Sequence, residues 1–443
     1  MIHTLKQLVP SWMKAPYHWV LALLSALVYG FPSNKLVVIG VTGTNGKSST
    51  VQFIAQMLES LGQHVGYTGT AGFYIDGEVI ENTLKMTMPG RFLLQRLLRD
   101  MVRAGCRYAL VETTSQGIEQ FRHLGINYDV VVFTNLTPEH IESHGGFENY
   151  KAAKGKLFAH LTHRKRKHFG DEVVEKISVI NADDPHAPFF LRFPADRIVR
   201  FSWGAGDASD DWFVVEPGQH GEDGLQVHIN GVAGFIPLHA LFEQRNAVSA
   251  FATVRALGFD RQRVFDAMKG LCPLPGRFEP VDEGQDFRVI VDYAYEPYAL
   301  EALLSAVDRL PGRRRIIGLH GSAGGGRDVA RRDKIGRLAG SREDIVIVTN
   351  EDPYDEDPRS IIEEVAKGAK AVGKKEGETV LLIDDRTEAI QRAIDMAESG
   401  DVVLLTGKGS ETIMAVAGGK KVPWSDRQAA QNALRRRLAT DRL

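Results

Sequence analysis

The chain has 443 residues, which predicts two or three domains, and its 43% hydrophobic content allows a large buried core. Its 54 Lys and Arg residues nearly balance 56 Asp and Glu residues, which argues against a nucleic-acid-binding surface. The only cysteines, Cys106 and Cys272, lie far apart and outside any paired motif. This pattern excludes a disulfide scaffold and a cysteine zinc site and fits a reducing cytoplasm.

The first predicted element is a nearly continuous apolar segment from Tyr17 to Phe31. It is shorter than the roughly 20 residues that a membrane span needs, and no small-residue cleavage site follows it. We interpret it as a helix docked on the next domain. A helix lying on a membrane surface is the alternative.

From residue 35 onward, strand and helix patterns alternate, which predicts a mostly parallel sheet with helices on both faces. A helix is expected over about 47–61, hairpins over 211–238, and further helices near 244–257 and 260–270. The strands predicted in this part are Lys35–Val41, Tyr108–Glu112, Asp129–Thr134 and Ile177–Asn181.

The run Pro273-Leu274-Pro275-Gly276 predicts a hinge, and a second β/α series begins after it. Its predicted strands are Phe287–Asp292, Arg315–Leu319, Ile345–Thr349, Val380–Ile383 and Val402–Leu405. The alternation of strands and helices predicts a Rossmann-like domain over residues 273–443.

A glycine-rich turn, Gly43-Thr44-Asn45-Gly46-Lys47-Ser48, links the first predicted strand to the first long helix. Backbone N–H groups of such a turn and the positive end of the helix dipole bind phosphate. Lys47 could reach the β- and γ-phosphates, and the Ser48 hydroxyl could ligate Mg²⁺. Val41 stands where the strict phosphate-loop pattern has glycine, so an ordinary turn is the alternative. The pattern predicts ATP and Mg²⁺ as cofactors.

The run from Thr42 to Thr50, with Thr-Asn inside the loop, resembles the phosphate loop of the Mur ligase superfamily. The resemblance implies an ATP-dependent amide ligase that proceeds through an acyl phosphate. It also implies a P-loop nucleotide-binding central domain over 35–272, with residues 1–34 as a short N-terminal helical segment. The residues expected to bind ATP are Gly43, Thr44, Asn45, Gly46, Lys47, Ser48, Ser49, Asn246, Arg277 and Asp292.

A metal centre is expected where two predicted strands end. Glu112 ends one strand, and His140 follows the end of the next. By spacing alone, His140 would be read as a structural histidine. The resemblance implies that Glu112 and His140 hold magnesium together with Ser48. It further implies that Lys154, in an Ala-Ala-Lys motif, is carbamylated by CO₂ and supports that metal. A solvated basic helix face is the alternative for Lys154. Lys47, Glu112, His140 and Lys154 are the expected catalytic residues.

Three later motifs resemble family motifs that contact the nucleotide. The resemblance implies that Asn246 contacts the adenine, Arg277 reaches the nucleotide, and Asp292 binds the ribose. The matches are incomplete, because Glu243 and Tyr295 stand where the family has Asn and His.

The C-terminal part resembles the tripeptide-synthetase (MurE) branch of the superfamily. It carries Gly407-Lys408-Gly409-Ser410-Glu411 and, near the end of the chain, Trp424-Ser425-Asp426-Arg427. The resemblance implies peptidoglycan stem-peptide synthesis. The residues expected to bind the substrates are Thr87, Thr114, Ser115, Arg332, Asp352, Tyr354, Gly407 and Glu411.

Two departures bear on the substrates. Diaminopimelate-adding enzymes grip a distal carboxylate with an arginine where Tyr354 stands, and the acidic run from Glu351 to Asp357 is more compatible with a cationic side chain such as that of lysine. The phosphate loop begins at Gly43, whereas the family places a UDP-sugar-binding domain before it. A folylpolyglutamate-synthetase-like or poly-amino-acid ligase with a non-UDP acceptor therefore stays as an alternative.

Two rival interpretations come from different functional classes: a catalytically silent nucleotide-binding protein and a switch NTPase. The expected partners are a small-molecule or glycopeptide substrate and an amino acid, with no nucleic acid. The expected state is a cytoplasmic monomer.

Overall fold

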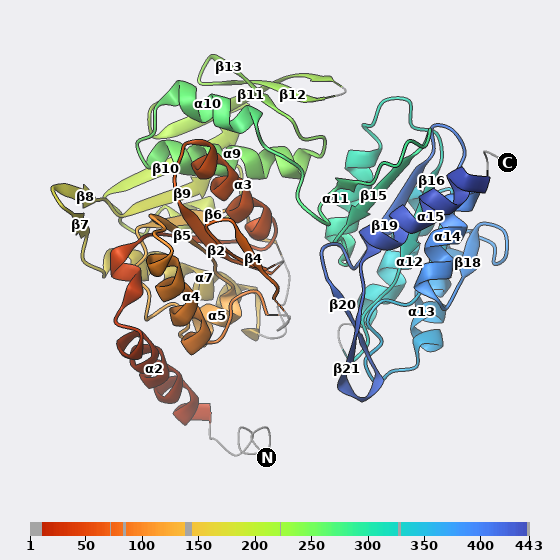
Figure 1. Cartoon of the computed structure of the whole chain (residues 1–443), viewed down its shortest axis with the longest axis horizontal. Helices are drawn as coiled ribbons and strands as arrows, with labels where there is room; N and C mark the ends of the chain where they lie inside the picture. Colours follow the sequence, from red (N-terminus) through yellow and green to blue (C-terminus); the bar gives the residue numbers. More distant parts are fainter. Residues whose placement is uncertain are drawn as a thin grey trace. The chain divides into compact units, whose positions relative to one another are not determined.

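The structure is a computed structural model that describes residues 11–70, 72–82, 86–137, 144–221, 223–326 and 329–440, with side chains from residue 16 onward. The chain divides into two compact units (Figure 1). Unit 1 comprises Met1–Leu238 and Phe242–Cys272, and unit 2 comprises His239–Leu241 and Pro273–Leu443. Each unit has its own sheet flanked by helices, which confirms the predicted α/β class. A separate segment at 1–34 stays a prediction.

Unit 1 is organised around a sheet that has eleven strands within the described residues, in the order β13-β12-β11-β10-β9-β6-β1-β5-β2-β3-β4. The strands from β11 to β2 run parallel to their neighbours, and both edges end in antiparallel hairpins. In chain order the strands are β1 (Val37–Thr42), β2 (Val65–Thr68), β3 (Phe73–Ile75), β4 (Glu78–Ile80), β5 (Tyr108–Glu112), β6 (Val130–Phe133), β9 (Ile177–Asn181), β10 (Arg197–Trp203), β11 (Trp212–Gly221), β12 (Gly224–Ile229) and β13 (Val232–Ile236). A separate hairpin pairs β7 (Lys167–Phe169) with β8 (Glu172–Val174).

The central strands β1, β5 and β6 are buried along their whole length, as expected for strands covered on both faces. In the register of β1 with its neighbours, Val41 pairs with Glu112 and Thr42 pairs with Phe133. The carboxyl ends of the three strands therefore lie side by side. The residues that follow these ends are brought together there, although they lie far apart in the sequence.

Helices cover both faces of this sheet (Figure 1). The apolar cluster on one face joins Leu98, Ile118 and Leu157 of three helices to Val38 and Val131 of the sheet. On the other face, the helix after the phosphate loop contacts β1, β2 and β5. The helices are α3 (Lys47–Ser60), α4 (Arg91–Arg103), α5 (Ser115–Glu119), α7 (Phe147–Thr162), α8 (Ala187–Phe190), α9 (Leu241–Ala256), α10 (Arg261–Lys269) and the 3₁₀ turn η1 (Pro32–Lys35).

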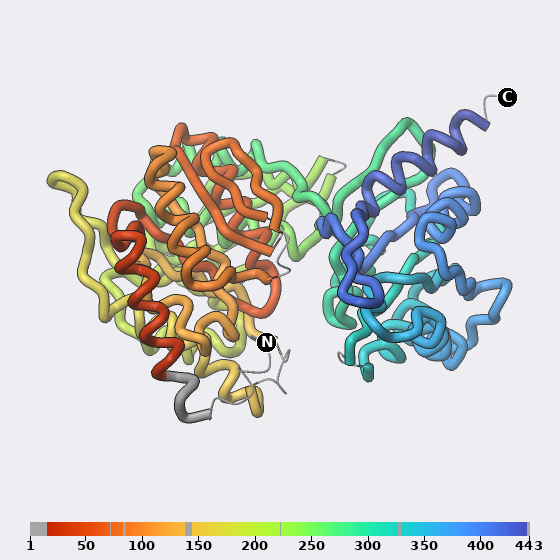
Figure 2. The backbone as a smooth tube through the Cα atoms, turned by 60° about the horizontal axis from the view of Figure 1, so that its bottom comes forward, coloured from red at the N-terminus to blue at the C-terminus, as the bar shows by residue number. Residues whose placement is uncertain are grey.

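The apolar N-terminal segment forms a helix, α2 (Ser11–Val28), which packs on α4 at the periphery of unit 1 (Figures 1 and 2). Its buried side chains are small: Ala22, Ser25 and Ala26. Ala22 and Ala26 also lie against Gly125. The helix is docked on the next domain, as predicted. Within the described residues, no helix is both long and apolar enough to cross a membrane.

Unit 2 is built on a sheet of six strands within its described residues, in the order β14-β15-β19-β16-β17-β18. All neighbours are parallel except β14, in agreement with the predicted Rossmann-like domain. The strands are β14 (Glu279–Pro280), β15 (Arg288–Asp292), β16 (Ile316–His320), β17 (Ile345–Val348), β18 (Val380–Leu382) and β19 (Val402–Thr406), with a separate hairpin of β20 (Ile413–Val416) and β21 (Lys420–Pro423).

On one face of this sheet, Ile390 and Leu434 of two helices pack against Val291, Leu319 and Leu405. Residues that follow the carboxyl ends of β17 and β19 form the second candidate site described below. The helices of unit 2 are α11 (Pro297–Val307), α12 (Ala330–Arg342), α13 (Pro358–Ala371), α14 (Arg386–Met396), α15 (Asp426–Thr440) and the 3₁₀ turn η2 (Ala417–Gly419).

Candidate active site

The phosphate loop joins the carboxyl end of β1 to the start of α3. Gly46 caps α3 with φ +79°, a left-handed conformation that glycine adopts without strain, and no described side chain caps the helix. The first N–H groups of α3 therefore keep the arrangement that binds anions. The Lys47 ammonium donates to the carbonyl oxygen of Thr44 at 2.6 Å, so this side chain is folded back over the loop.

The loop is held from a neighbouring strand by Asn135, a residue that the sequence analysis did not select. Its Oδ1 accepts from the backbone N–H of Asn45 at 2.9 Å, and its Nδ2 donates to the Asn45 carbonyl at 3.0 Å. Its own carbonyl accepts from the Thr44 N–H. A residue immediately after a buried strand next to β1 is well placed for this role, and that position was the available signal.

Ser48 and Glu112, both predicted as metal ligands, are in direct contact. The Ser48 hydroxyl lies 3.0 Å from each oxygen of the Glu112 carboxylate, which is buried. The carboxylate also accepts from the Thr70 backbone N–H at 2.9 Å. The Thr70 hydroxyl in turn lies 2.9 Å from that of Thr87, a predicted substrate residue. Three predicted side chains are therefore linked in one polar chain.

The Lys154 side chain comes from α7 and reaches the same loop. Its ammonium is buried and donates to the Gly43 carbonyl at 2.7 Å, and it lies 4.6 Å from the centre of the Tyr150 ring. The Tyr150 hydroxyl is 3.1 Å from the Thr44 hydroxyl. The alternative of a solvated basic face is wrong for Lys154, although the neighbouring Lys151 does pair with an exposed glutamate at the surface.

The donors around Ser48 fit a magnesium ion, because a hydroxyl and a carboxylate are the hard oxygen ligands that this ion prefers. His140 lies outside the described residues, so its predicted ligand role stays a prediction. Among the described residues, no three His, Cys, Asp or Glu side chains converge as a ready-made metal cage.

The other predicted residues of unit 1 lie around this centre in different ways. Asn246 is immediately beside the phosphate loop: a Cβ atom built on Gly46 would lie 2.2 Å from its Oδ1. Thr114 accepts from the Gly117 N–H as the N-cap of α5. The Ser115 hydroxyl is 3.0 Å from Nε2 of His144. Ser49 is buried in the first turn of α3.

In unit 2, Asp292 is buried at the end of β15 and accepts two backbone N–H groups, from Phe278 at 2.7 Å and from Ala294 at 2.8 Å. Burial raises the pKa of its carboxyl, and the nearby Arg277 guanidinium partly opposes that shift. The Cζ atom of Arg277 lies 4.8 Å from the centre of the Tyr293 ring. The structure thus brings both predicted nucleotide residues of unit 2 together.

A second polar cluster joins the loops after β17 and β19. The Lys408 ammonium is fully buried and lies 3.1 Å from both oxygens of Asp352 and 2.5 Å from Glu411. The Tyr293 hydroxyl donates to Glu411 at 3.2 Å. Asp352, Gly407 and Glu411 are therefore brought together as predicted substrate residues, with Lys408 as the cation that holds them.

The acidic run after Asn350 is not a free negative surface. The prediction that this run favours a lysine substrate assumed that its charges were unpaired, and that assumption was wrong. Asp352 is neutralised by Lys408, and Glu356 is paired with Arg332 at 2.7 Å. Asp357 accepts from the Ser360 N–H as the N-cap of α13. The sequence shows the acidic residues of this run, but it does not show which basic side chains lie beside them in the fold. Arg332, a predicted substrate residue, donates hydrogen bonds from its two Nη atoms to Glu356 and Glu364.

Glu351 is the exception within that run, and the sequence analysis did not select it as a site residue. It is buried, and its Oε2 has no hydrogen-bond partner among the described residues. Burial raises the pKa of its carboxyl, against the pull of Arg386, Arg331 and Lys408. A buried acceptor without a partner marks a place where a ligand can donate.

Gly407 lies directly against this carboxyl. Its φ is +97°, and a Cβ atom placed there would lie 2.3 Å from Oε2 of Glu351. We expect Gly407→Ala to raise the KM for the amino acid while leaving the KM for ATP unchanged, because the new methyl group would displace Glu351. Gly377→Ala is the matched control, since its φ is +81° and nothing lies within 4 Å of the added Cβ. Steady-state kinetics with each substrate varied in turn would check this, and equal KM values in the two variants would contradict it.

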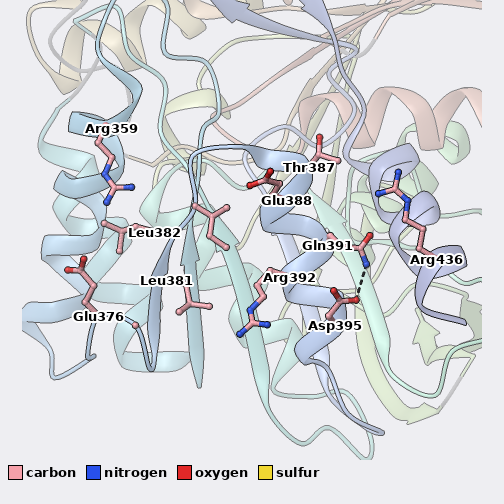
Figure 3. Close-up of a pocket in the computed structure, with 12 residues that line it drawn as sticks. Arg359, Glu376, Leu381, Leu382, Thr387, Glu388, Gln391, Arg392, Asp395 and Arg436 are labelled. Carbon is pink, nitrogen blue, oxygen red and sulfur yellow. Dashed lines mark hydrogen bonds between the residues drawn. The ribbon is translucent and has the colours of Figure 1, made fainter. Parts of the chain in front are cut away.

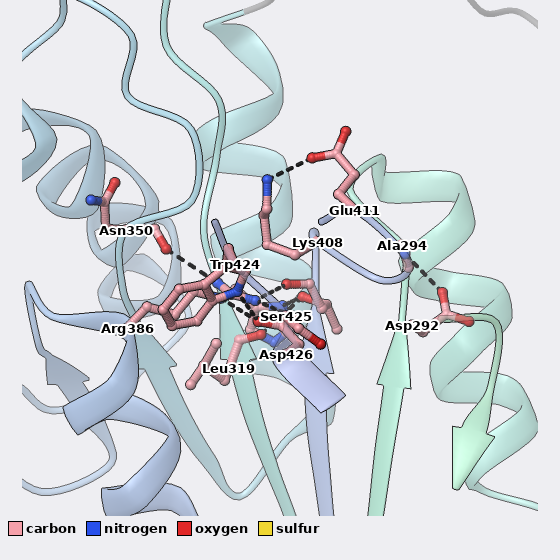
Figure 4. A network of polar contacts seen from close by, with 12 residues as sticks. Asp292, Ala294, Leu319, Asn350, Arg386, Lys408, Glu411, Trp424, Ser425 and Asp426 are labelled. Atoms are coloured by element: carbon pink, nitrogen blue, oxygen red, sulfur yellow. Dashed lines mark hydrogen bonds and ion pairs between the residues drawn. The ribbon is translucent and has the colours of Figure 1, made fainter. Parts of the chain in front are cut away.

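A buried ion pair lies behind these loops (Figure 4). The Arg386 guanidinium binds Asp426 through two hydrogen bonds, Nε at 2.8 Å and Nη2 at 2.7 Å. It also donates to the carbonyl oxygens of Asn350 at 3.2 Å and Thr406 at 2.7 Å. Trp424 Nε1 donates to the same carboxylate at 2.8 Å. The Trp-Ser-Asp-Arg motif therefore has a structural role, in fixing the residues that precede both loops.

Unit 2 also has a hollow of ≈ 680 Å³ on another surface, between α13, α14 and β18 (Figure 3). Arginines and acids both line it, including Arg359, Arg392 and Glu376. None of the predicted site residues lines it. The candidate site is therefore defined by the loops described above.

Comparison with known proteins agrees with this geometry. Residues 41–254 match the Mur ligase middle domain, and residues 276–409 match the Mur ligase, glutamate ligase domain. A UDP-N-acetylmuramyl-tripeptide synthetase of Roseiflexus is 38% identical over 424 residues, which cover 94% of this chain and 81% of the relative. A UDP-N-acetylmuramoyl-L-alanyl-D-glutamate–2,6-diaminopimelate ligase of Geobacillus thermodenitrificans is 36% identical, with 94% and 82% covered.

Solved structures show the same fold. A 2,6-diaminopimelate ligase of the same kind superimposes with a TM-score of 0.61 at 28% identity, covering 91% of this chain and 79% of that one. Mycobacterium tuberculosis folylpolyglutamate synthase with ADP gives 0.66 at 19% identity, covering 94% and 93%, which supports the fold alone. The chain therefore belongs to the Mur ligase family and is an ATP-dependent ligase that joins an amino acid to a carboxylate.

Proposed function

We propose that this ligase adds an amino acid to the peptide carboxylate of a UDP-N-acetylmuramoyl dipeptide, in the cytoplasm and as a monomer. The observation that carries the chemistry is the convergence of Lys47, Ser48, Glu112 and Lys154 on one phosphate loop. The choice of acceptor rests on the relatives, whose names specify muramoyl peptides.

The proposed reaction has two steps. A substrate carboxylate oxygen attacks the γ-phosphorus of ATP, which gives an acyl phosphate and ADP. The amine of the amino acid then attacks the acyl carbon, the amide bond forms, phosphate leaves, and the amine loses a proton. The first step brings anions together, so it needs fixed positive charge at the γ-phosphate.

Lys47 supplies part of that charge from the start of α3. Ser48 and Glu112 would hold a magnesium ion, which supplies further positive charge at the phosphates when it is bound. Asn135 keeps the loop in position through its three bonds to Thr44 and Asn45. The contribution of the protein is therefore positioning and electrostatics rather than covalent chemistry.

For the amino acid, we propose a basic side chain such as that of lysine. Tyr354 carries no charge with which to bind a distal carboxylate, and Glu351 offers a buried carboxyl oxygen without a partner among the described residues. A substrate ammonium beside Glu351 would favour its ionised form and compensate for the burial that raises its pKa.

Phosphate release from ATP with the purified full-length protein tests the proposal. Release should require both UDP-N-acetylmuramoyl dipeptide and one amino acid, with L-lysine giving a higher kcat/KM than meso-diaminopimelate. Release only with a γ-glutamyl or other non-UDP acceptor would replace the proposed acceptor with that of a folylpolyglutamate-like ligase. A preference for meso-diaminopimelate would overturn the proposal for the amino acid alone.

Lys154 is proposed to act as its carbamate, which would turn a buried cation into a metal-supporting carboxylate. We expect Lys154→Met to lower kcat/KM by about 10- to 100-fold, the range seen when a residue that supports a metal ligand is lost. Lys151→Met, one turn away on α7, should have little effect, because Lys151 pairs with the exposed Glu148 and not with the phosphate loop. A carbamate carbon signal in the NMR spectrum after incubation with ¹³C-bicarbonate, present in the wild type and absent in Lys154→Met, would distinguish modification from a merely structural lysine.

A further inference from the structure

The exposed face of α2 is the most concentrated apolar surface among the described residues. Seven of the fifteen large hydrophobic side chains found exposed in the structure belong to the segment from residue 17 to residue 31. They are Tyr17 at 54%, Trp19 at 49%, Val20 at 53%, Leu24 at 44%, Leu27 at 64%, Val28 at 56% and Phe31 at 40%. Single exposed hydrophobic residues need no explanation, but a contiguous set of this kind marks an interaction site.

The helix geometry shows that five of these side chains form one stripe along α2. Residues 17, 20, 24, 27 and 28 follow the helical spacing of three and four, and the buried Ala22, Ser25 and Ala26 lie on the opposite side against unit 1. From residue 16 to residue 34 the chain has no Asp, Glu, Lys or Arg. The stripe is therefore neither the buried side of the helix nor a charged solvent-facing side.

Positive charge borders this stripe on the neighbouring helix. α4 carries four arginines and one aspartate. Arg96, Arg99 and Arg103 share one face of it by their spacing, and the Arg99 guanidinium lies 5.9 Å from the centre of the Tyr29 ring. The side chains of Arg96 and Arg103 are both 63% exposed, and both pair with the single Asp100 of α4, at 3.8 and 3.6 Å. One aspartate cannot neutralise three arginines, so this face of α4 keeps a net positive charge.

We propose that α2 binds the surface of an anionic phospholipid bilayer, with its apolar stripe among the acyl chains and the α4 arginines at the headgroups. Tyr17 and the nearby Trp19 are exposed at the N-terminal end of the stripe, and their amphipathic rings suit the membrane–water interface. The stripe lies on a convex helix without charged groups of its own. A bilayer can cover such a surface without matching its shape, whereas a folded partner would need a complementary groove.

The energetics require both features. An apolar stripe of this kind adds binding free energy in proportion to the area that it buries, and basic residues add about 1 kcal/mol each near an anionic surface. The electrostatic part is screened by salt. The ligase would thereby act at the membrane face while its catalytic residues stay in water.

Vesicle flotation with the full-length protein tests this proposal. Vesicles that contain phosphatidylglycerol should bind the protein at low salt, and phosphatidylcholine vesicles should bind it more weakly. Leu24→Glu with Leu27→Glu should lower the binding by at least about tenfold, since two charges would enter the apolar layer. Arg96→Glu with Arg103→Glu should remove the preference for the anionic lipid. Val79→Glu, at a 73% exposed valine elsewhere on unit 1, should leave the binding unchanged.

Phosphate release should be the same in the Leu24/Leu27 variant and the wild type, because in the described part of the chain α2 packs on α4 and not on the phosphate loop. Absence of binding to either vesicle, or equal binding by the Leu24/Leu27 variant, would overturn the proposal. Light scattering tests whether a second copy of the chain covers the stripe instead. That would be shown if the wild type formed a dimer, the Leu24/Leu27 variant were a monomer, and neither bound lipid.

Discussion

Lys47→Ala should lower kcat for phosphate release by about 10²- to 10³-fold, with little change in thermal stability. The lysine contributes a positive charge at the developing negative charge of the transferred phosphoryl group, and a single preorganised donor of this kind is worth about 10²–10³ in rate. In the structure its ammonium donates to the Thr44 carbonyl of its own loop, so the packing of the core does not depend on it.

Lys156→Ala is the control for this experiment, because Lys156 lies on α7 of the same unit and pairs with Glu119 in an exposed ion pair. It should retain the wild-type rate. The measurement is a coupled phosphate assay at saturating ATP, with melting curves of both variants. Undiminished turnover in Lys47→Ala would remove the loop from the proposed mechanism.

Asp426→Ala should lower the free energy of unfolding of unit 2 by about 3–5 kcal/mol, because it leaves the Arg386 guanidinium charged and buried without its partner. Both side chains of the pair are almost completely buried, at 1% and 0% exposure. Without Asp426, the Arg386 guanidinium is no longer held in place as the hydrogen-bond donor to the carbonyl oxygens of Asn350 and Thr406. We therefore also expect a higher KM for the amino acid in whatever fraction stays folded.

Asp384→Ala provides the comparison, since it breaks another Arg–Asp pair of unit 2, with Arg359, that is exposed to solvent. Exposed pairs contribute little, so its urea midpoint should stay near that of the wild type. Urea unfolding followed by circular dichroism separates the two variants. Equal midpoints for Asp426→Ala and Asp384→Ala would show that the buried pair is dispensable.

The sequence was most informative where local patterns decide the structure. Buried strands, the glycine turn and the following helix each have a short-range signature, so β1, the phosphate loop and α3 could be placed directly. The resemblance to the Mur ligase superfamily grouped Ser48 with Glu112 at one metal centre, and the structure brings these two side chains into contact.

The residues that escaped prediction act through distant partners. Asn135 binds a loop about 90 positions earlier, and Lys408 neutralises Asp352 from 56 positions away. The acidic run was misread for the same reason, because neither Lys408 nor Arg332 can be assigned to it by spacing. The orphaned carboxyl of Glu351 follows from burial, which no local pattern shows.

Arg386 holds the loops after β17 and β19 by backbone carbonyls, those of Asn350 and Thr406, rather than by side chains. A support of this kind does not depend on the identity of the residues it positions. A substitution at a position such as Tyr354 would therefore leave this support in place. If this loop contacts the amino acid as proposed, single replacements in it could change the substrate without dismantling the scaffold beneath.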